Sequence, residues 1–170
     1  MDTIHLHLLL NHIPVLGTML ALALLLFALP RQNVARARDA LRLLVGLGIV
    51  AVIVYLTGGA AEEGVEDLPG VSESLIETHE EAALAATIAL GVLAVGAIAA
   101  LWRYRTRTLP RWVTLAGFAG TLVVAGMMGW TANLGGQIRH SEIRSGAATT
   151  TAEGEAGGER NGGDRERGEQ

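Results

Sequence analysis

Four long apolar blocks dominate this sequence, and they constrain its fold more than any other feature. They are Leu8–Leu29, Leu43–Tyr55, Ala82–Trp102 and Trp112–Trp130. A helix of about 20 apolar residues spans a bilayer, and the second block reaches that length when residues 40–60 are counted and Arg42 extends to the interface. Charged residues make up only 18% of the chain, against about a quarter in soluble proteins. The pattern excludes a soluble globular enzyme and predicts a polytopic membrane protein.

The blocks predict an all-α fold with four membrane-spanning helices. We expect a transmembrane domain over residues 1–144, with spans at about 8–29, 40–60, 82–102 and 112–134. The connections on the arginine-rich side are short, which makes neighbouring helices antiparallel and favours an up-down-up-down four-helix bundle. Residues 145–170 are acidic and glycine-rich and contain no aliphatic side chain larger than alanine. This tail is expected to be disordered, because it has nothing to bury.

Charge in the connecting segments predicts the orientation of the bundle. Residues 30–42 and 103–111 each contain four arginines, whereas residues 61–81 contain eight acidic residues and no arginine. Because basic loops stay in the cytoplasm, both termini and the acidic loop are expected outside. The acidic loop 61–81 is also the surface expected to contact redox or membrane-complex partners. Besides the lipid bilayer no other class of partner is indicated, and nucleic acid is not expected.

Five histidines carry the one chemical signal in the sequence, and the predicted orientation places all of them at the outward side. They are His5, His7, His12, His79 and His140. His12 lies within an apolar stretch just before Pro14, where a polar side chain needs a partner and often marks function. On an ideal helix His7 lies about 140° from His12. His7 therefore joins a site with His12 only if the first helix is irregular near Pro14 or begins after His7.

These histidines lead to two hypotheses for a bound cofactor. Histidines on different helices of a bundle can ligate b-type haem, and the first choice of pair is His12 with His79, with His7 and His140 as further candidates. Imidazoles and carboxylates also suit a transition metal. The candidate set for a metal is His7, His12, His79, His140, Glu77 and Glu80. The absence of cysteine excludes thiolate ligands and covalently attached haem.

The motifs at both ends of the helical region resemble those of a known family. His7-x-x-x-x-His12-x-Pro14, followed by a long apolar helix, and the ending Gly135-Gly136…His140 resemble a bacterial family of predicted four-helix membrane proteins with a domain of unknown function. The resemblance implies the four-helix fold, a recurring set of outward histidines and the bacterial inner membrane. It also implies a redox setting, because some members are joined to cytochrome c-like domains.

The sequence leaves two classes of function open. One is a redox or electron-transfer protein that binds haem or a metal ion through the histidine cluster. The alternative is a structural or assembly subunit that binds no cofactor and holds a partner through its small-residue faces and acidic loop. No catalytic residue is predicted, because the sequence contains no helical metal-ligand motif such as HExxH, and an enzyme is the less favoured interpretation.

Overall fold

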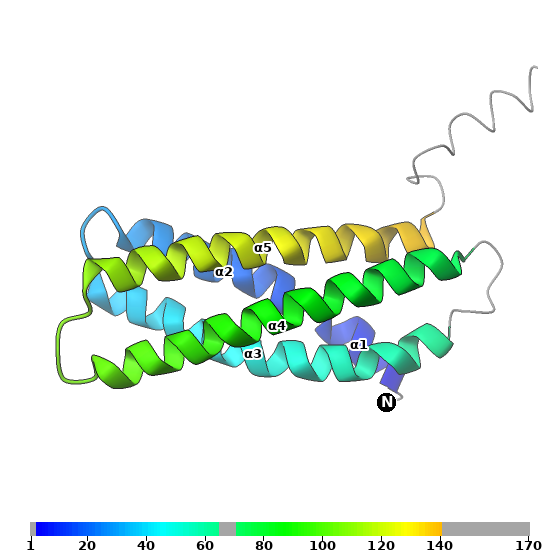
Figure 1. Cartoon of the computed structure of the whole chain (residues 1–170), viewed down its shortest axis with the longest axis horizontal. Helices are drawn as coiled ribbons and strands as arrows, with labels where there is room; N and C mark the ends of the chain where they lie inside the picture. Colours follow the sequence, from blue (N-terminus) through cyan, green and yellow to red (C-terminus); the bar gives the residue numbers. More distant parts are fainter. Residues whose placement is uncertain (1–2, 65–70, 141–170) are drawn as a thin grey trace, which may run out of the picture.

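The computed structural model describes residues 3–64 and 71–140 as five helices arranged in one elongated bundle (Figure 1). They are α1 (Thr3–Leu10), α2 (His12–Ala28), α3 (Val34–Glu63), α4 (Glu73–Arg103) and α5 (Arg111–Arg139). Four segments are long and apolar enough to cross a membrane, namely Ile4–Ala28, Val34–Ala61, Glu73–Arg103 and Arg111–Ile138. The expected all-α four-helix membrane bundle is therefore confirmed. The expected disordered tail, 145–170, lies outside the described residues.

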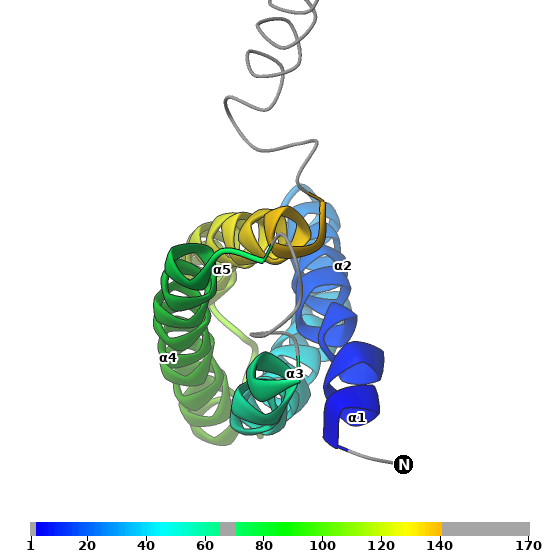
Figure 2. The ribbon, with the colours of Figure 1, turned by 90° about the vertical axis from the view of Figure 1, so that its right-hand side faces the viewer.

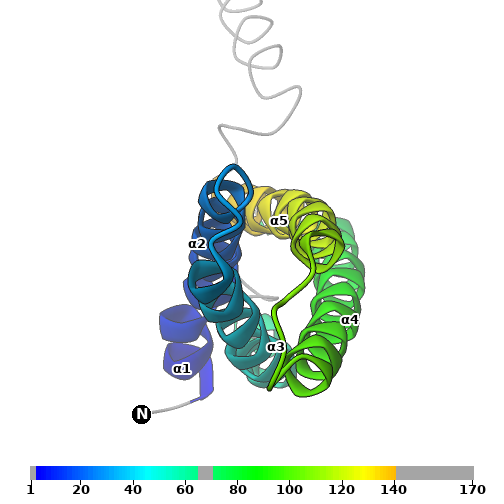
Figure 3. The same ribbon diagram turned by 90° about the vertical axis from the view of Figure 1, so that its left-hand side faces the viewer.

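The helices form a closed ring when the bundle is seen along its axis (Figures 2 and 3). Helix α2 packs beside α3 and α5, and α4 packs beside the same two helices. Helices α2 and α4 are therefore diagonal, and from α2 to α5 consecutive helices run in opposite directions (Figure 1). The short helix α1 stands outside this ring and packs mainly on α3.

The first span is divided at Asn11, near the point at which the sequence left an irregularity open. Proline has no backbone N–H, so Pro14 leaves the carbonyl of Leu10 without its helical donor. The chain turns at Asn11, whose backbone N–H still donates to the carbonyl of His7 at 2.9 Å. This turn directs α1 away from the axis of α2 and toward α3.

Close approach of the helices depends on small residues. At Gly48 of α3 an added Cβ would lie 2.7 Å from the Cβ of Ala94 on α4, and at Gly120 of α5 it would lie 2.8 Å from Leu93. Leucines fill the remaining interior, and Leu25, Leu44 and Leu90 are fully buried. Large apolar side chains also cover the outside, as expected for a surface that faces lipid rather than water. Examples are Leu16, Leu56, Val92 and Trp102, each more than 60% exposed.

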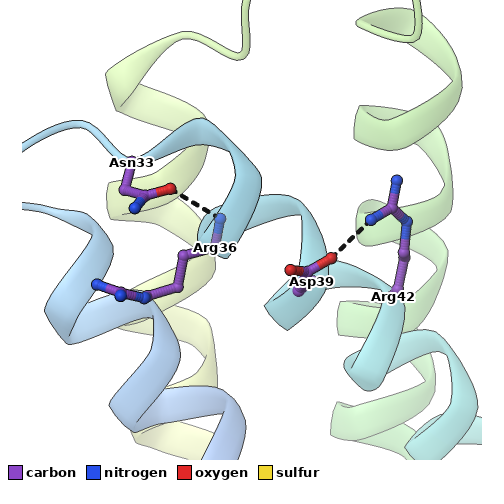
Figure 4. Close-up of polar contacts among 4 residues, drawn as sticks. All are labelled: Asn33, Arg36, Asp39 and Arg42. Atoms are coloured by element: carbon purple, nitrogen blue, oxygen red, sulfur yellow. Dashed lines mark hydrogen bonds and ion pairs between the residues drawn. The ribbon is translucent and has the colours of Figure 1, made fainter.

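The arginine-rich end is held together by hydrogen bonds between its connecting segments. The Asn33 side chain accepts from the backbone N–H of Arg36 and so caps the start of α3, and Asp39 pairs with Arg42 on the exposed side of the helix (Figure 4). The guanidinium of Arg38 donates to the carbonyls of Tyr104 and Arg107, at 2.7 and 2.8 Å. Arg38 thereby fastens the segment between α4 and α5 onto α3.

Candidate functional site

Two histidines at the acidic end of the bundle, His7 of α1 and His79 of α4, form hydrogen bonds to neighbouring helices. His7 Nδ1 lies 3.1 Å from the carbonyl oxygen of Val54 and 3.4 Å from the Thr57 hydroxyl, both on α3. His79 Nδ1 lies 3.0 Å from the carbonyl oxygen of Thr131 on α5. These hydrogen bonds join α1 to α3 and α4 to α5.

The hydrogen bonds define which nitrogen of each ring carries the proton. A carbonyl oxygen can only accept, so Nδ1 must donate in both His7 and His79. The Thr57 hydroxyl lies 3.1 Å from the carbonyl oxygen of Ile53 and 2.9 Å from that of Val54. It therefore donates its proton to a carbonyl of α3. In the neutral form of each histidine, Nε2 therefore keeps its lone pair. This is the arrangement of metal-ligating histidines, whose second nitrogen donates to a carbonyl or carboxylate.

Glycines allow the two rings to lie against neighbouring helices. An added Cβ at Gly135 of α5 would be 3.1 Å from Cε1 of His79, and at Gly58 of α3 it would be 3.7 Å from Cε1 of His7. A Cβ contact of 3.1 Å is tighter than most real Cβ contacts, so the His79 ring occupies space that a larger residue would need. Glycine at 135 is thus part of the site, because it gives the imidazole access to the Thr131 carbonyl.

The acidic side chains of α4 do not line this interior. Glu73, Glu77, Glu80 and Glu81 are all exposed, whereas Ile76 of α4 and Leu134 of α5 are 5% and 4% exposed. Among the residues that the structure describes, both imidazoles accordingly lie against backbone carbonyls, a threonine hydroxyl and glycine positions, and not against these glutamates.

The structure places His7, and not His12, on the side of the first span that meets the bundle. His12 is exposed at the start of α2, and its pairing with His79 stays a prediction. Residues His7 and His12 lie on different sides of the span, as their separation of about 140° on an ideal helix requires. A common site for His7 and His12 was expected only if the helix is irregular near Pro14, and the structure gives hydrogen bonds across helices to His7 alone of these two.

The six-residue metal set is not gathered in the described part of the chain. Glu77, Glu80 and His140 are exposed, and His140 lies at the C-terminal cap of α5. Within residues 3–64 and 71–140 no three side chains of His, Cys, Asp or Glu are placed to hold one metal ion. His7 and His79 each keep a hydrogen bond to a backbone carbonyl of a neighbouring helix.

Several residues of the site were not singled out by the sequence interpretation. Thr57 and Thr131 both lie near the end of an apolar span. Thr57 directly precedes a glycine pair, and Thr131 precedes another by four residues. A threonine close to a glycine pair is the sequence signal by which both could have been found. Asn11 is a further case, because its side-chain oxygen is buried and has no hydrogen-bond partner among the described residues. Such an atom costs about 1–3 kcal/mol, which marks the α1–α2 junction as a polar point within an apolar span.

Comparison with protein families, curated proteins and solved structures gives no match for this chain. The structural interpretation therefore depends on the helices and the histidine pair themselves.

Proposed function

We propose that this integral membrane protein binds a b-type haem at its acidic end, where His7 and His79 would hold the iron, and that it serves in electron transfer. The observation that carries the proposal is the shared geometry of the two rings. Each Nδ1 donates to a carbonyl on a neighbouring helix, which leaves both Nε2 atoms as donors to iron.

The donor set fits haem better than a single metal ion. Two histidines on different helices of a bundle can both ligate haem iron. A lone transition metal is usually held by three or four protein ligands, and the described residues gather no such group.

Each residue of the site has a role in this proposal. When bound, haem supplies reversible one-electron oxidation and reduction of its iron. The Val54 and Thr131 carbonyls fix the orientation of the two imidazoles, and their hydrogen bonds to Nδ1–H raise the basicity of Nε2. Gly135 lets the His79 ring lie against α5. The redox setting implied by the resemblance to a bacterial membrane family agrees with this role.

The test is the absorbance spectrum of full-length protein made in haem-supplied cells and purified in mild detergent. We expect a Soret band and a pyridine haemochrome spectrum of b type. His7→Ala and His79→Ala should each lose the haem. His12→Ala is the matched control, because His12 is exposed in the same apolar span and its removal should leave haem content unchanged.

Two results would contradict the proposal. Folded wild-type protein without haem would favour the structural or assembly subunit, and metal analysis of the same sample would identify any bound ion. Loss of haem in His12→Ala but not in His7→Ala would show that the assigned ligands are wrong. Size-exclusion chromatography and circular dichroism separate these results from simple misfolding.

A further inference from the structure

A groove separates α4 and α5 near the arginine-rich end, far from the histidine pair. Its volume is about 370 Å³. Small residues form most of its walls, because they leave space that larger side chains would fill. The lining includes Gly96, Ala97 and Ala100 of α4 and Val113, Ala116 and Gly117 of α5.

The groove opens on the outer surface of the bundle. Its floor consists of buried residues, among them Leu41 of α3, Ala97 and Val113, whereas Gly96 and Ala116 at its edges are exposed. An added Cβ at Gly96 would have no atom within 4 Å. The groove is thus continuous with the surface that the apolar side chains of this span identify as facing lipid.

The two walls of the groove differ in length. On α4 the lining runs from Leu93 to Tyr104, a rise of about 16 Å, and on α5 from Trp112 to Gly117, a rise of about 8 Å, at about 1.5 Å per residue. The helices are in close contact beyond it, where an added Cβ at Gly120 would be 2.8 Å from Leu93. One leaflet of hydrocarbon is about 15 Å thick, so the groove takes the part of an acyl chain nearest its headgroup.

The mouth of the groove carries positive charge. Arg103, Tyr104 and Trp112 line it, and the Arg103 guanidinium lies 5.4 Å from the centre of the Tyr104 ring. Four exposed arginines surround this region, namely Arg103, Arg105, Arg107 and Arg111. None of them pairs with a carboxylate within residues 3–64 and 71–140. The N-terminus of α5 adds the positive end of a helix dipole.

We propose that this groove binds an anionic phospholipid, with one acyl chain between α4 and α5 and its phosphate at Arg103. The apolar walls select the chain, and the excess of arginine selects a negatively charged headgroup. Basic pockets between helices at a membrane surface bind anionic lipids in this way. The proposal is independent of the haem site, which lies at the opposite end of the bundle.

Native mass spectrometry of the full-length protein tests this, after delipidation and addition of either phosphatidylglycerol or phosphatidylcholine. We expect wild type to retain phosphatidylglycerol at least about fivefold more strongly, because one arginine near a membrane surface contributes about that factor. Gly96→Leu fills the groove from α4 and Ala116→Leu fills it from α5, so both should lose the retained lipid. Arg103→Gln should weaken phosphatidylglycerol binding by about fivefold.

The chain offers a matched control for each kind of change. Gly126→Leu alters an exposed glycine of α5 outside the groove, where an added Cβ meets no atom within 4 Å. Arg31→Gln removes the same charge from the other connection at this end. Both should bind lipid like wild type. Equal retention of the two lipids, or equal effects in control and groove variants, would overturn the proposal and indicate nonspecific lipid association.

Discussion

The two histidines of the first span lie on different sides of it. His7 forms a hydrogen bond to α3, whereas His12 is exposed. Asn11 separates α1 from α2, but its dihedral angles are helical, with φ −59° and ψ −27°. An ideal helical wheel already places His7 and His12 about 140° apart. It does not show which of the two faces a neighbouring helix, because that depends on how the span packs on α3.

Gly135 allows a test of the site at the scale of one side chain. Gly135→Val places methyl groups where the His79 ring lies, so the ring must leave its hydrogen bond to Thr131. We expect a loss of about 1–3 kcal/mol in the free energy of unfolding, as for other overpacked positions, and loss of the His79 Nδ1–H signal in NMR of labelled histidine. Gly129→Val is the control, since an added Cβ there meets nothing within 4 Å. An unchanged His79 signal in Gly135→Val would contradict the prediction.

At the scale of helices, hydrophobicity predicted the elements well and their ends less well. The spans over 82–102 and 112–134 correspond to α4 and α5, but α4 begins at Glu73 and α5 continues to Arg139. Helical hydrogen bonding continues past the apolar residues into polar sequence, so the length of an apolar block underestimates the helix. The inward faces were harder to predict, because membrane helices are apolar on all sides and periodicity does not distinguish lipid from core.

Alanine substitutions at Gly48 and Gly46 distinguish the effect of helix packing on stability from the effect of helix propensity in α3. Gly48→Ala should lower the free energy of unfolding by about 1–3 kcal/mol, because the new Cβ meets the Cβ of Ala94 at 2.7 Å. An alanine methyl cannot rotate away, so the backbones of α3 and α4 must separate. Gly46→Ala should be neutral or slightly stabilising, since no atom lies within 4 Å of its added Cβ. Reversible unfolding in mixed detergent measures both, and similar losses would show that the α3–α4 contact is not as close as described.

At the scale of the whole molecule, the two ends of the bundle differ in charge. The connections 30–42 and 103–111 contain eight arginines and one aspartate, whereas residues 61–81 contain eight acidic residues. In the bundle both arginine-rich connections lie at one end, and α3 ends and α4 begins at the other (Figure 1). The described acidic side chains Glu63, Glu73, Glu77, Glu80 and Glu81 are exposed at the end opposite the arginines.

This separation predicts that both termini lie outside the cytoplasm. The positive-inside rule assigns the arginine-rich end to the cytoplasm. Alkaline phosphatase fused after Gln170 should therefore be active, and a green fluorescent protein fused at the same position should remain dark. A fusion in the connection around Thr106 should give the reverse result. Fluorescence from the C-terminal fusion would contradict the orientation and would place the histidine pair on the cytoplasmic side.

The charge difference between the ends also determines how permanent this orientation is. To turn over in the membrane, the protein would have to carry its arginine-rich end through hydrocarbon, at about 2.5–3.5 kcal/mol for each arginine by insertion scales. A membrane potential adds about 2.3 kcal/mol per net charge for each 100 mV. No thermal fluctuation supplies that sum, so the sidedness acquired during synthesis lasts for the lifetime of the molecule. The two ends are consequently exposed to two separate aqueous compartments and never exchange them.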